Sequence, residues 1–278
     1  MCSFRDQETT LDTMLRLITI SLLFTICFGF KQGRIVGGHS TDITKHPYQV
    51  SLEMNGLHNC GGSIISPDWV VTAGHCVAPV NTSLIIYNPI ILRVRAGSTY
   101  REKGGYLHNI SKAIVHPYYR EILFMGADIP EYDVAVLKVD TPFLFNDAVK
   151  PISMTHVSPS DGDAAVVTGW GVFNYTLRPG YSNKKLPSQL QALDVGIVDQ
   201  QECKRELLVI TDQMVCASAP ETFQDACNGD SGGPLVSKGK LVGVVSWAFD
   251  LCAMTGRPEV YADVANLRKW IELVTGIA

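Results

Sequence analysis

The chain has 278 residues, of which 46% are hydrophobic and 18% are charged, and its formal net charge is -4. This composition is typical of a globular protein and excludes a disordered or fibrous chain. No stretch rich in Lys and Arg occurs, so we expect no nucleic-acid partner and no binding to an anionic membrane. The chain shows no repeat, long linker or low-complexity tract, which favours a single body.

The first predicted element is a signal peptide over residues 1–29. Its apolar core, Leu17–Phe30, has about the length of a signal-peptide core and is shorter than the ~20 residues that cross a bilayer. We therefore expect a secreted, extracellular protein with no membrane attachment once the signal is removed. Residues 1–13 carry acidic side chains that are unusual in a signal peptide, so a start at Met14 stays open. An uncleaved signal anchor is the alternative to secretion.

From Ile35 onward the sequence predicts many short strands. Apolar or alternating runs are separated by Gly, Pro, Asn and Asp, which favours an all-β barrel or sandwich. Near the C-terminus, apolar residues recur at three- and four-residue spacing from Val264 to Val274 and predict one amphipathic helix. The clearest strand runs are Tyr48–Leu52, Ser63–Ile65, Trp69–Thr72, Val134–Val139, Ala164–Thr168 and Leu241–Trp247.

Eight cysteines occur, and Cys2 and Cys27 lie in the segment that we expect to be removed. An even number then remains, which favours disulfides in a secreted chain, although spacing alone leaves their pairing open. No pair has the CxxC spacing of a zinc site, so we expect no metal and no cofactor. The remaining cysteines are Cys60, Cys76, Cys203, Cys216, Cys227 and Cys252.

Three sequons permit N-glycosylation in an extracellular protein. They begin at Asn81, Asn109 and Asn174. Sequons also occur by chance, so the occupancy of each one stays open.

A serine in a glycine-rich segment is the strongest candidate for a reactive nucleophile. Residues 227–234 read Cys-Asn-Gly-Asp-Ser-Gly-Gly-Pro, and glycines let backbone N–H groups approach a ligand. Such a loop can hold an oxyanion. A hydroxyl is a weak nucleophile until a base takes its proton, so Ser231 requires a histidine, and this histidine requires an acidic partner. Taken alone, the segment could equally be a glycine-rich turn.

The candidate base is His75. It follows the apolar run at residues 70–72 and stands beside Cys76, which fixes the imidazole where the chain leaves the sheet. The other histidines lie in polar, turn-like settings, and we expect them to be solvated surface residues. They are His39, His46, His58, His108, His116 and His156.

The candidate acidic partner is Asp133. It immediately precedes the apolar run Val134–Leu137, which carries it toward the interior, where an unpaired charge is costly. It therefore needs a partner such as His75. Its nearest competitor is Asp128, but the Gly and Pro around that residue suggest an exposed loop.

Four motifs stand in a recognisable order: Ile-Val-Gly-Gly at residues 35–38, Ala-Gly-His-Cys at 73–76, Asp133 before its apolar run, and Gly-Asp-Ser-Gly-Gly-Pro at 229–234. In this order and spacing, residues 35–278 resemble the trypsin/chymotrypsin family of serine proteases. The resemblance implies two six-stranded antiparallel β-barrels with a C-terminal helix and an active site in the cleft between the barrels.

The resemblance also assigns roles to the candidate residues. The catalytic triad would be His75, Asp133 and Ser231, and the N–H groups of Gly229 and Ser231 would form the oxyanion hole. The disulfides would join Cys60 to Cys76, Cys203 to Cys216, and Cys227 to Cys252.

The substrate-binding residues follow from the same resemblance. The backbone of Ser246, Trp247 and Ala248 would pair with the substrate as an added strand. Asp225 would form the base of the specificity pocket and favour cleavage after Arg or Lys. Open pockets of the family carry glycine where this chain has Ala248 and Glu259. If Glu259 points inward, arginine should be disfavoured relative to lysine, or the pocket closed to both; if it points to solvent, ordinary cleavage after Arg and Lys should follow.

The family is made as inactive precursors, so a short activation peptide, residues 30–34, is expected. An activating protease would cleave after Arg34, and the freed amine of Ile35 would pair with the carboxylate of Asp230. Two departures from the family pattern occur. Gly74 replaces an alanine, with little consequence expected, and the stretch from residue 97 to 105 offers only Glu102 as a carboxylate, so we expect no bound calcium.

The function that we expect is that of a serine endopeptidase acting on polypeptides, as a monomer, with protein protease inhibitors as further partners. A first alternative is an active protease with altered or restricted specificity, because of Ala248 and Glu259. A second is a catalytically inactive homologue that acts as a binding partner, although the intact triad positions argue against it. A third is an esterase, but the cleft of this fold suits extended peptides.

Overall fold

The structure is a computed structural model. It describes residues 38–78, 87–171, 174–178, 181–220, 229–248 and 257–277, and only the backbone of 174–178 and 181–185. These residues belong to the unit Gly33–Ala278. Several predicted features lie outside the described residues: the segments 1–29 and 30–34 with Met14 and Arg34, then Ile35, Asn81, Asp225, Cys227 and Cys252.

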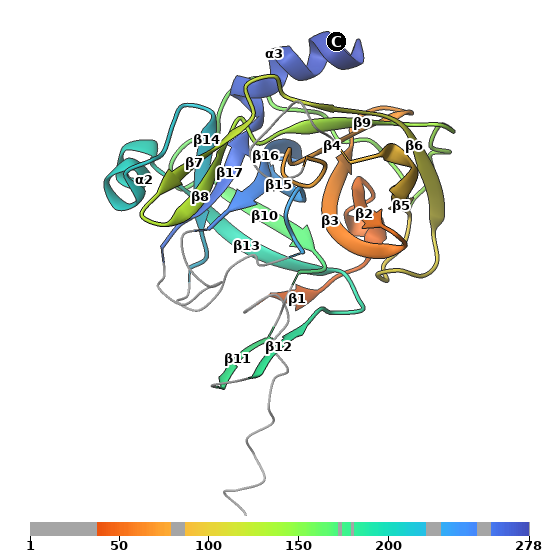
Figure 1. The fold of residues 1–278 in the computed structure, drawn as a ribbon, viewed down its shortest axis with the longest axis horizontal. Coiled ribbons are helices and arrows are strands. Elements are labelled where there is room, and N and C mark those ends of the chain that lie inside the picture. The colour runs from red at the N-terminus through yellow and green to blue at the C-terminus, as the bar shows by residue number, and fades with distance from the viewer. Residues whose placement is uncertain are drawn as a thin grey trace, which may run out of the picture. The chain divides into compact units, whose positions relative to one another are not determined.

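The first six-stranded barrel is built from the N-terminal half of the described chain (Figure 1). Its neighbouring strands are all antiparallel, and the pairing of β2 with β5 closes the sheet. All four side chains of β4, Trp-Val-Val-Thr, are buried, as a continuous apolar run predicts. In order around the barrel the strands are β2 (Gln49–Met54), β3 (Leu57–Ile64), β4 (Trp69–Thr72), β9 (Ala135–Val139), β6 (Tyr106–Val115) and β5 (Leu92–Ala96).

The second barrel is closed by the pairing of β13 with β14. A short seventh strand, β1 (His39–Ser40), is added to the outside of this sheet at β13. In order around the barrel the strands are β13 (Gln191–Val198), β10 (Ala164–Gly169), β15 (Pro234–Ser237), β16 (Lys240–Trp247), β17 (Glu259–Asp263) and β14 (Met214–Ser218). Together with the first barrel, this confirms the predicted all-β fold of two six-stranded antiparallel barrels.

Each barrel has its own apolar interior. The first interior includes Val50, Leu92 and Leu137, none of which is exposed to solvent. The second includes Val167 and Leu235. Both sheets are closed, so the loops at the ends of their strands are available for contacts between the barrels. The candidate catalytic residues lie on such loops.

The predicted C-terminal helix is α3 (Val264–Thr275). The carboxylate of Asp263 accepts a hydrogen bond from the N–H of Ala265 and so caps the first turn. The apolar positions of the predicted periodicity, including Leu267 and Ile271, are buried in a cluster that contains residues of both barrels, among them Val244 of β16. The helix ends at Gly276, whose φ of 72° is the left-handed conformation that glycine tolerates.

A second helix, α2 (Gln200–Leu207), was not predicted from the sequence, which indicated only the C-terminal one. Only Cys203 and Leu207 of its eight residues are buried, so the apolar periodicity was too short to detect. Asp199 caps its start by accepting from two backbone N–H groups. The disulfide between Cys203 and Cys216 joins α2 to β14.

Two hairpins complete the described chain (Figure 1): β7 (Arg120–Phe124) with β8 (Ala127–Glu131), and β11 (Asn174–Arg178) with β12 (Tyr181–Lys185). Asp128 is exposed, as expected, but it lies on strand β8 and not in a loop. Short 3-10 turns occur at Ile43–Lys45 and Pro89–Ile91. Within the described residues, no helix has the length and apolar character needed to cross a membrane.

Candidate active site

His75 and Asp133 are brought together by the pairing of β4 with β9. Thr72 at the end of β4 lies opposite Ala135 at the start of β9. His75 follows the first of these strands and Asp133 precedes the second, so both lie at the same edge of the first barrel. The Nδ1 atom of His75 is 2.8 Å from Oδ2 of Asp133, and the backbone N–H of His75 donates to Oδ1 over 2.9 Å.

The second barrel supplies a further donor to the same carboxylate. The hydroxyl of Ser246, on β16, donates to Oδ2 of Asp133 over 2.6 Å. The Asp133 side chain is only 2% exposed, whereas that of His75 is 26% exposed. Asp133 therefore lies where the two barrels meet, and the imidazole stands between it and the solvent.

The electrostatics of this pair follow from its burial and its hydrogen bonds. Burial alone would raise the pKa of Asp133, but the charge of His75, its hydrogen bonds and that of Ser246 hold the pKa below its usual value. Burial alone would lower the pKa of His75, yet the charge and hydrogen bond of Asp133 raise it above its usual value, and Glu121 contributes in the same direction. The aspartate stays ionised and stabilises the imidazolium.

The loop that carries Ser231 is held against the first barrel by its backbone. The carbonyl of Ser231 accepts a hydrogen bond from the N–H of Gly61 over 2.8 Å. A Cβ atom on Gly232, whose φ is 77°, would overlap Oγ1 of Thr72, which leads into the His75 segment. The serine loop is thus packed against the end of β4, three residues before the candidate base.

A disulfide also links β3 to the segment that carries His75. Cys60 and Cys76 are bonded, so β3, whose Gly61 holds the serine loop, is tied to the residue that follows His75. In the described residues, Cys60, His75 and Cys76 form one close group of potential metal ligands. Both sulfurs are already in the disulfide, so the group does not offer the thiolates that a metal requires. The pair Cys227 and Cys252 lies outside the described residues.

His58 is buried and not a solvated surface residue, so the expectation for it was wrong. Its Nε2 atom is 2.9 Å from the carbonyl oxygen of Gly229, and its Nδ1 is 2.7 Å from Oγ of Ser51. Because a carbonyl can only accept, Nε2 carries the proton, and Nδ1 accepts from the serine hydroxyl. Burial lowers the pKa of His58 to about 4, which keeps this neutral form at neutral pH. His58 therefore anchors the backbone of a candidate oxyanion-hole residue.

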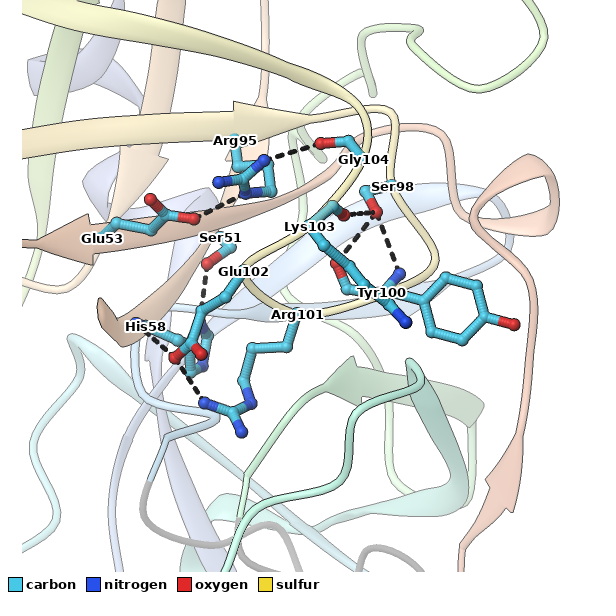
Figure 2. Close-up of polar contacts among 10 residues, drawn as sticks. All are labelled: Ser51, Glu53, His58, Arg95, Ser98, Tyr100, Arg101, Glu102, Lys103 and Gly104. Atoms are coloured by element: carbon cyan, nitrogen blue, oxygen red, sulfur yellow. Dashed lines mark hydrogen bonds and ion pairs between the residues drawn. The ribbon is translucent and has the colours of Figure 1, made fainter. Parts of the chain in front are cut away.

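The loop that carries Arg101 and Glu102 also contacts His58. Figure 2 shows Glu102 accepting from the backbone N–H of His58 over 3.1 Å while it pairs with the guanidinium of Arg101. In the same view Arg95 pairs with the buried Glu53 over 2.6 Å. Glu102, the one carboxylate of residues 97–105, is thus bound to the backbone of His58 and the side chain of Arg101.

His116 is a second histidine that the structure buries, against expectation. Its ring stacks on that of Tyr132 with the ring centres 4.8 Å apart, and Trp270 of α3 lies at the same distance. Of the other histidines, His39 and His156 are exposed and His46 and His108 are half-buried. Residue types alone could not distinguish these cases, because the partners that bury His58 and His116 come from distant parts of the chain.

Gly74 has a packing role that the sequence did not suggest. A Cβ atom at this position would lie 2.9 Å from Cδ2 of Tyr119 and 3.2 Å from Oδ1 of Asp133. The missing methyl group therefore makes room for the buried tyrosine ring beside the His75–Asp133 pair. The expectation that the replacement of alanine has little consequence was wrong, because Gly74 and Tyr119 fit each other.

The specificity-pocket candidates are only partly described, because Asp225 lies outside the described residues. Ser246 and Trp247 are buried, whereas Ala248 is exposed. The side chain of Glu259 is buried, at 5% exposure, and its Oε2 accepts a hydrogen bond from the hydroxyl of Tyr261 over 2.6 Å. Glu259 thus points into the protein and not to solvent, on the same face of β17 as Tyr261.

Asp230, the expected partner of a new N-terminus, is fully buried. Its Oδ1 accepts a hydrogen bond from the N–H of Gly171 over 2.7 Å. A Cβ atom on Gly169 would overlap this carboxylate oxygen, so only glycine leaves room for it there. The carboxylate is therefore held under the serine loop, while Ile35 and Arg34 lie outside the described residues.

Comparisons with known proteins agree on one family. Residues 35–271 match the family model described as Trypsin. Trypsin alpha of Drosophila melanogaster is 43% identical over 243 residues, which cover 86% of each chain. Trypsin delta of the same species is 42% identical over 243 residues, which cover 86% of this chain and 87% of the relative.

A solved structure is similar as well. It is that of neuropsin, a serine protease expressed in the limbic system of mouse brain. The alignment has a TM-score of 0.73 at 27% sequence identity and covers 86% of this chain and 98% of that chain.

Proposed function

Because this chain belongs to the trypsin family of serine endopeptidases, we propose that His75, Asp133 and Ser231 are its catalytic triad. The observation that carries the proposal is the partly buried hydrogen bond of 2.8 Å between His75 and Asp133, next to the backbone contact that holds the Ser231 loop against the first barrel. Asp133 fixes the tautomer of His75, with the proton on Nδ1, which leaves Nε2 free to act as a base.

The proposed reaction proceeds through an acyl-enzyme, as the family's serine triad does. His75 removes the proton of Ser231 while its Oγ forms a bond to the scissile carbonyl carbon. The N–H groups of Gly229 and Ser231 stabilise the resulting oxyanion. The C–N bond then breaks, the amine leaves with the proton from His75, and water hydrolyses the ester by the same steps. The hydrogen bond from His58 to the carbonyl oxygen of Gly229 helps to orient the loop that carries these N–H groups.

The triad proposal is tested by labelling the activated protein with a fluorophosphonate, which reacts only with an activated serine. We expect stoichiometric labelling of the native protein and none of Ser231→Ala. A matched control is Ser160→Ala, which removes an exposed serine outside the site and any sequon and should label like the native protein. Labelling that persists in Ser231→Ala would assign the nucleophile elsewhere, and a native protein that never labels would favour the inactive binding homologue.

We also propose that the protein is secreted, remains monomeric and acts on polypeptides, with protein protease inhibitors as further partners. The predicted signal peptide supports secretion, and the family supports the substrate class.

For the residue before the scissile bond, the P1 residue, we propose a preference for lysine over arginine. Asp225 would bind the cation at the base of the pocket through a charge-assisted hydrogen bond. The burial of Glu259 and its hydrogen bond with Tyr261 support a second carboxylate at the base of the pocket. This carboxylate would shorten the pocket, so that the longer arginine side chain fits less well than lysine. A charged pocket lined by two carboxylates would exclude an apolar P1 side chain.

This preference is measured as the ratio of kcat/KM for matched substrates that end in Lys or Arg. We expect the ratio to favour Lys in the native enzyme and to fall by about tenfold in Glu259→Gly, because the pocket becomes deeper. Glu259→Gln keeps the side-chain volume and removes the charge, so it separates the two effects. Rapid cleavage after Phe, with none after Lys or Arg, would contradict the assignment of Asp225.

We further propose that the protein is made as a zymogen and activated by cleavage after Arg34. The freed amine of Ile35 would pair with Asp230, and the complete burial of this residue next to Ser231 supports the role, because an ion pair formed there is shielded from water. The ion pair would order the loop that carries Gly229 and Ser231.

The activation proposal is tested by replacing the cleavage site. Arg34→Gln should stay inactive after treatment with trypsin, whereas the native precursor should gain activity together with a new N-terminus at Ile35. Arg205→Gln, which removes an exposed arginine of α2, should be activated normally. Full activity in the uncleaved native chain would show that no such switch exists.

A further inference from the structure

An open apolar pocket lies on the first barrel, between the start of β6 and the segment that follows β9. Its volume is about 500 Å³, and its lining includes Tyr106, Leu107, Thr141, Pro142 and Leu144. Tyr106 is 63% exposed, Leu107 is 45% exposed and Leu144 is 83% exposed. None of these residues belongs to the candidate active site. An exposed apolar surface of this kind is typical of a place where another group binds.

The sequon that begins at Asn109 lies beside this apolar pocket, and it is the one sequon of the three whose side chains the structure describes. Side chains alternate along a strand, so Asn109 and Leu107 point to the same, outer face of β6, about 6.8 Å apart. Both side chains are exposed. The Nδ2 atom of Asn109 donates to Oδ2 of Asp140 over 2.9 Å, and Asp140 precedes Thr141 of the pocket lining. The side-chain amide therefore stands at the edge of the pocket.

Further hydrogen bonds hold the segment after β9 against β6. The N–H of Asp140 donates to the carbonyl oxygen of Asn109 over 3.0 Å. Nδ1 of His108 donates to the carbonyl oxygen of Thr141 over 2.8 Å. The ring of His108 also packs on the buried Phe143, with the ring centres 4.5 Å apart. The amide of Asn109 and the lining of the pocket are thus held in a fixed arrangement.

We propose that Asn109 carries an N-linked glycan and that the first sugars of this glycan lie over the apolar pocket. The proposal rests on the proposed secretion of the protein, because such glycans are attached in the secretory pathway. The occupant is the glycan because its attachment atom stands at the edge of the pocket. The C–H faces of sugar rings pack on aromatic and aliphatic side chains, which Tyr106 and Leu144 supply.

The covalent bond forms at Nδ2 of Asn109 before the chain folds. The donor is an oligosaccharide joined through its C1 atom to a lipid diphosphate. The bond from C1 to Nδ2 forms, the bond from C1 to the diphosphate oxygen breaks, and Nδ2 loses one proton. The hydrogen that stays on Nδ2 keeps the bond to Asp140 in the folded protein. Because Asn109 is exposed, the rest of the glycan extends into solvent.

The modification is tested by expressing the full 278-residue chain in eukaryotic cells, behind an added secretion signal. Entry into the secretory pathway then does not depend on the chain's own signal peptide. We expect peptide N-glycosidase to lower the mass of the protein and to leave an aspartate in place of Asn109. Ser111→Ala removes the sequon while Asn109 stays, so this glycan should be lost, whereas Ser111→Thr keeps the sequon and should retain it.

A secreted native chain with an unmodified Asn109 would overturn the proposal. The chain without the added signal is expressed in parallel. If only this chain stays in the cells, the proposed secretion is contradicted, while the glycan at Asn109 is still decided by the chain that has the added signal.

The position of the glycan is tested with a dye that fluoresces on apolar protein surfaces. We expect Ser111→Ala to bind more dye than Ser111→Thr, because the pocket is uncovered. Adding Leu144→Ser to Ser111→Ala should abolish the excess. The control is the addition of Leu273→Ser, which replaces a leucine of 82% exposure on α3 and should leave the excess unchanged.

Equal dye binding by Ser111→Ala and Ser111→Thr would show that the glycan points away from the pocket, and so would overturn that part of the proposal. Concentration-dependent dimerisation of the glycosylated native protein, lost in Leu144→Ser, would also overturn it and would assign the pocket to a second copy of the chain.

Discussion

The carboxylate of Asp133 is the charge around which the candidate active site of this protein is organised. It is almost completely buried, and a buried carboxylate is tolerated only when donors satisfy it. The donors come from both barrels: the backbone and ring of His75 from the first, and the hydroxyl of Ser246 from the second. Loss of a partner from such a buried pair costs on the order of 3 to 5 kcal/mol. The same contacts that orient His75, the proposed base, therefore also join the two barrels.

The loop that carries Ser231 lies close to the first barrel because glycines occupy the contact. Gly61 of β3 and Gly233 face each other so closely that a Cβ atom on Gly61 would lie 2.8 Å from Cα of Gly233. Gly232 fits against the Thr72 side chain, and Gly74 leaves room for Tyr119 beside the His75–Asp133 pair. Glycine thus fits these positions because a Cβ atom would overlap a neighbouring backbone or side chain. At Gly61 and Gly232 a larger residue would move the Ser231 loop away from the first barrel.

The sequence predicted those features that depend on local pattern. Alternating and continuous apolar runs located strands such as Trp69–Thr72, and three- and four-residue spacing located α3. The motif order led to the family and with it to the two barrels. Features that depend on distant partners were missed. His58 stands on β3 among polar neighbours, and its bond to Gly229 joins residues 171 positions apart in the chain. The hairpin of β7 and β8 and the direction of Glu259 were likewise decided by tertiary packing.

The central claim is that Asp133 sets the basicity of His75, and the pH dependence of kcat/KM tests it most directly. His75 must be neutral to accept a proton, so activity should be lost as the pH falls through the folded-state pKa of His75, which Asp133 raises above the usual value of a histidine. In Asp133→Asn the charge that raises this pKa is gone while burial still lowers it, so the acidic limb should move to lower pH. By the magnitude known for the family's triad, kcat should fall on the order of 10⁴-fold. An acidic limb at the same pH in both proteins would contradict the account.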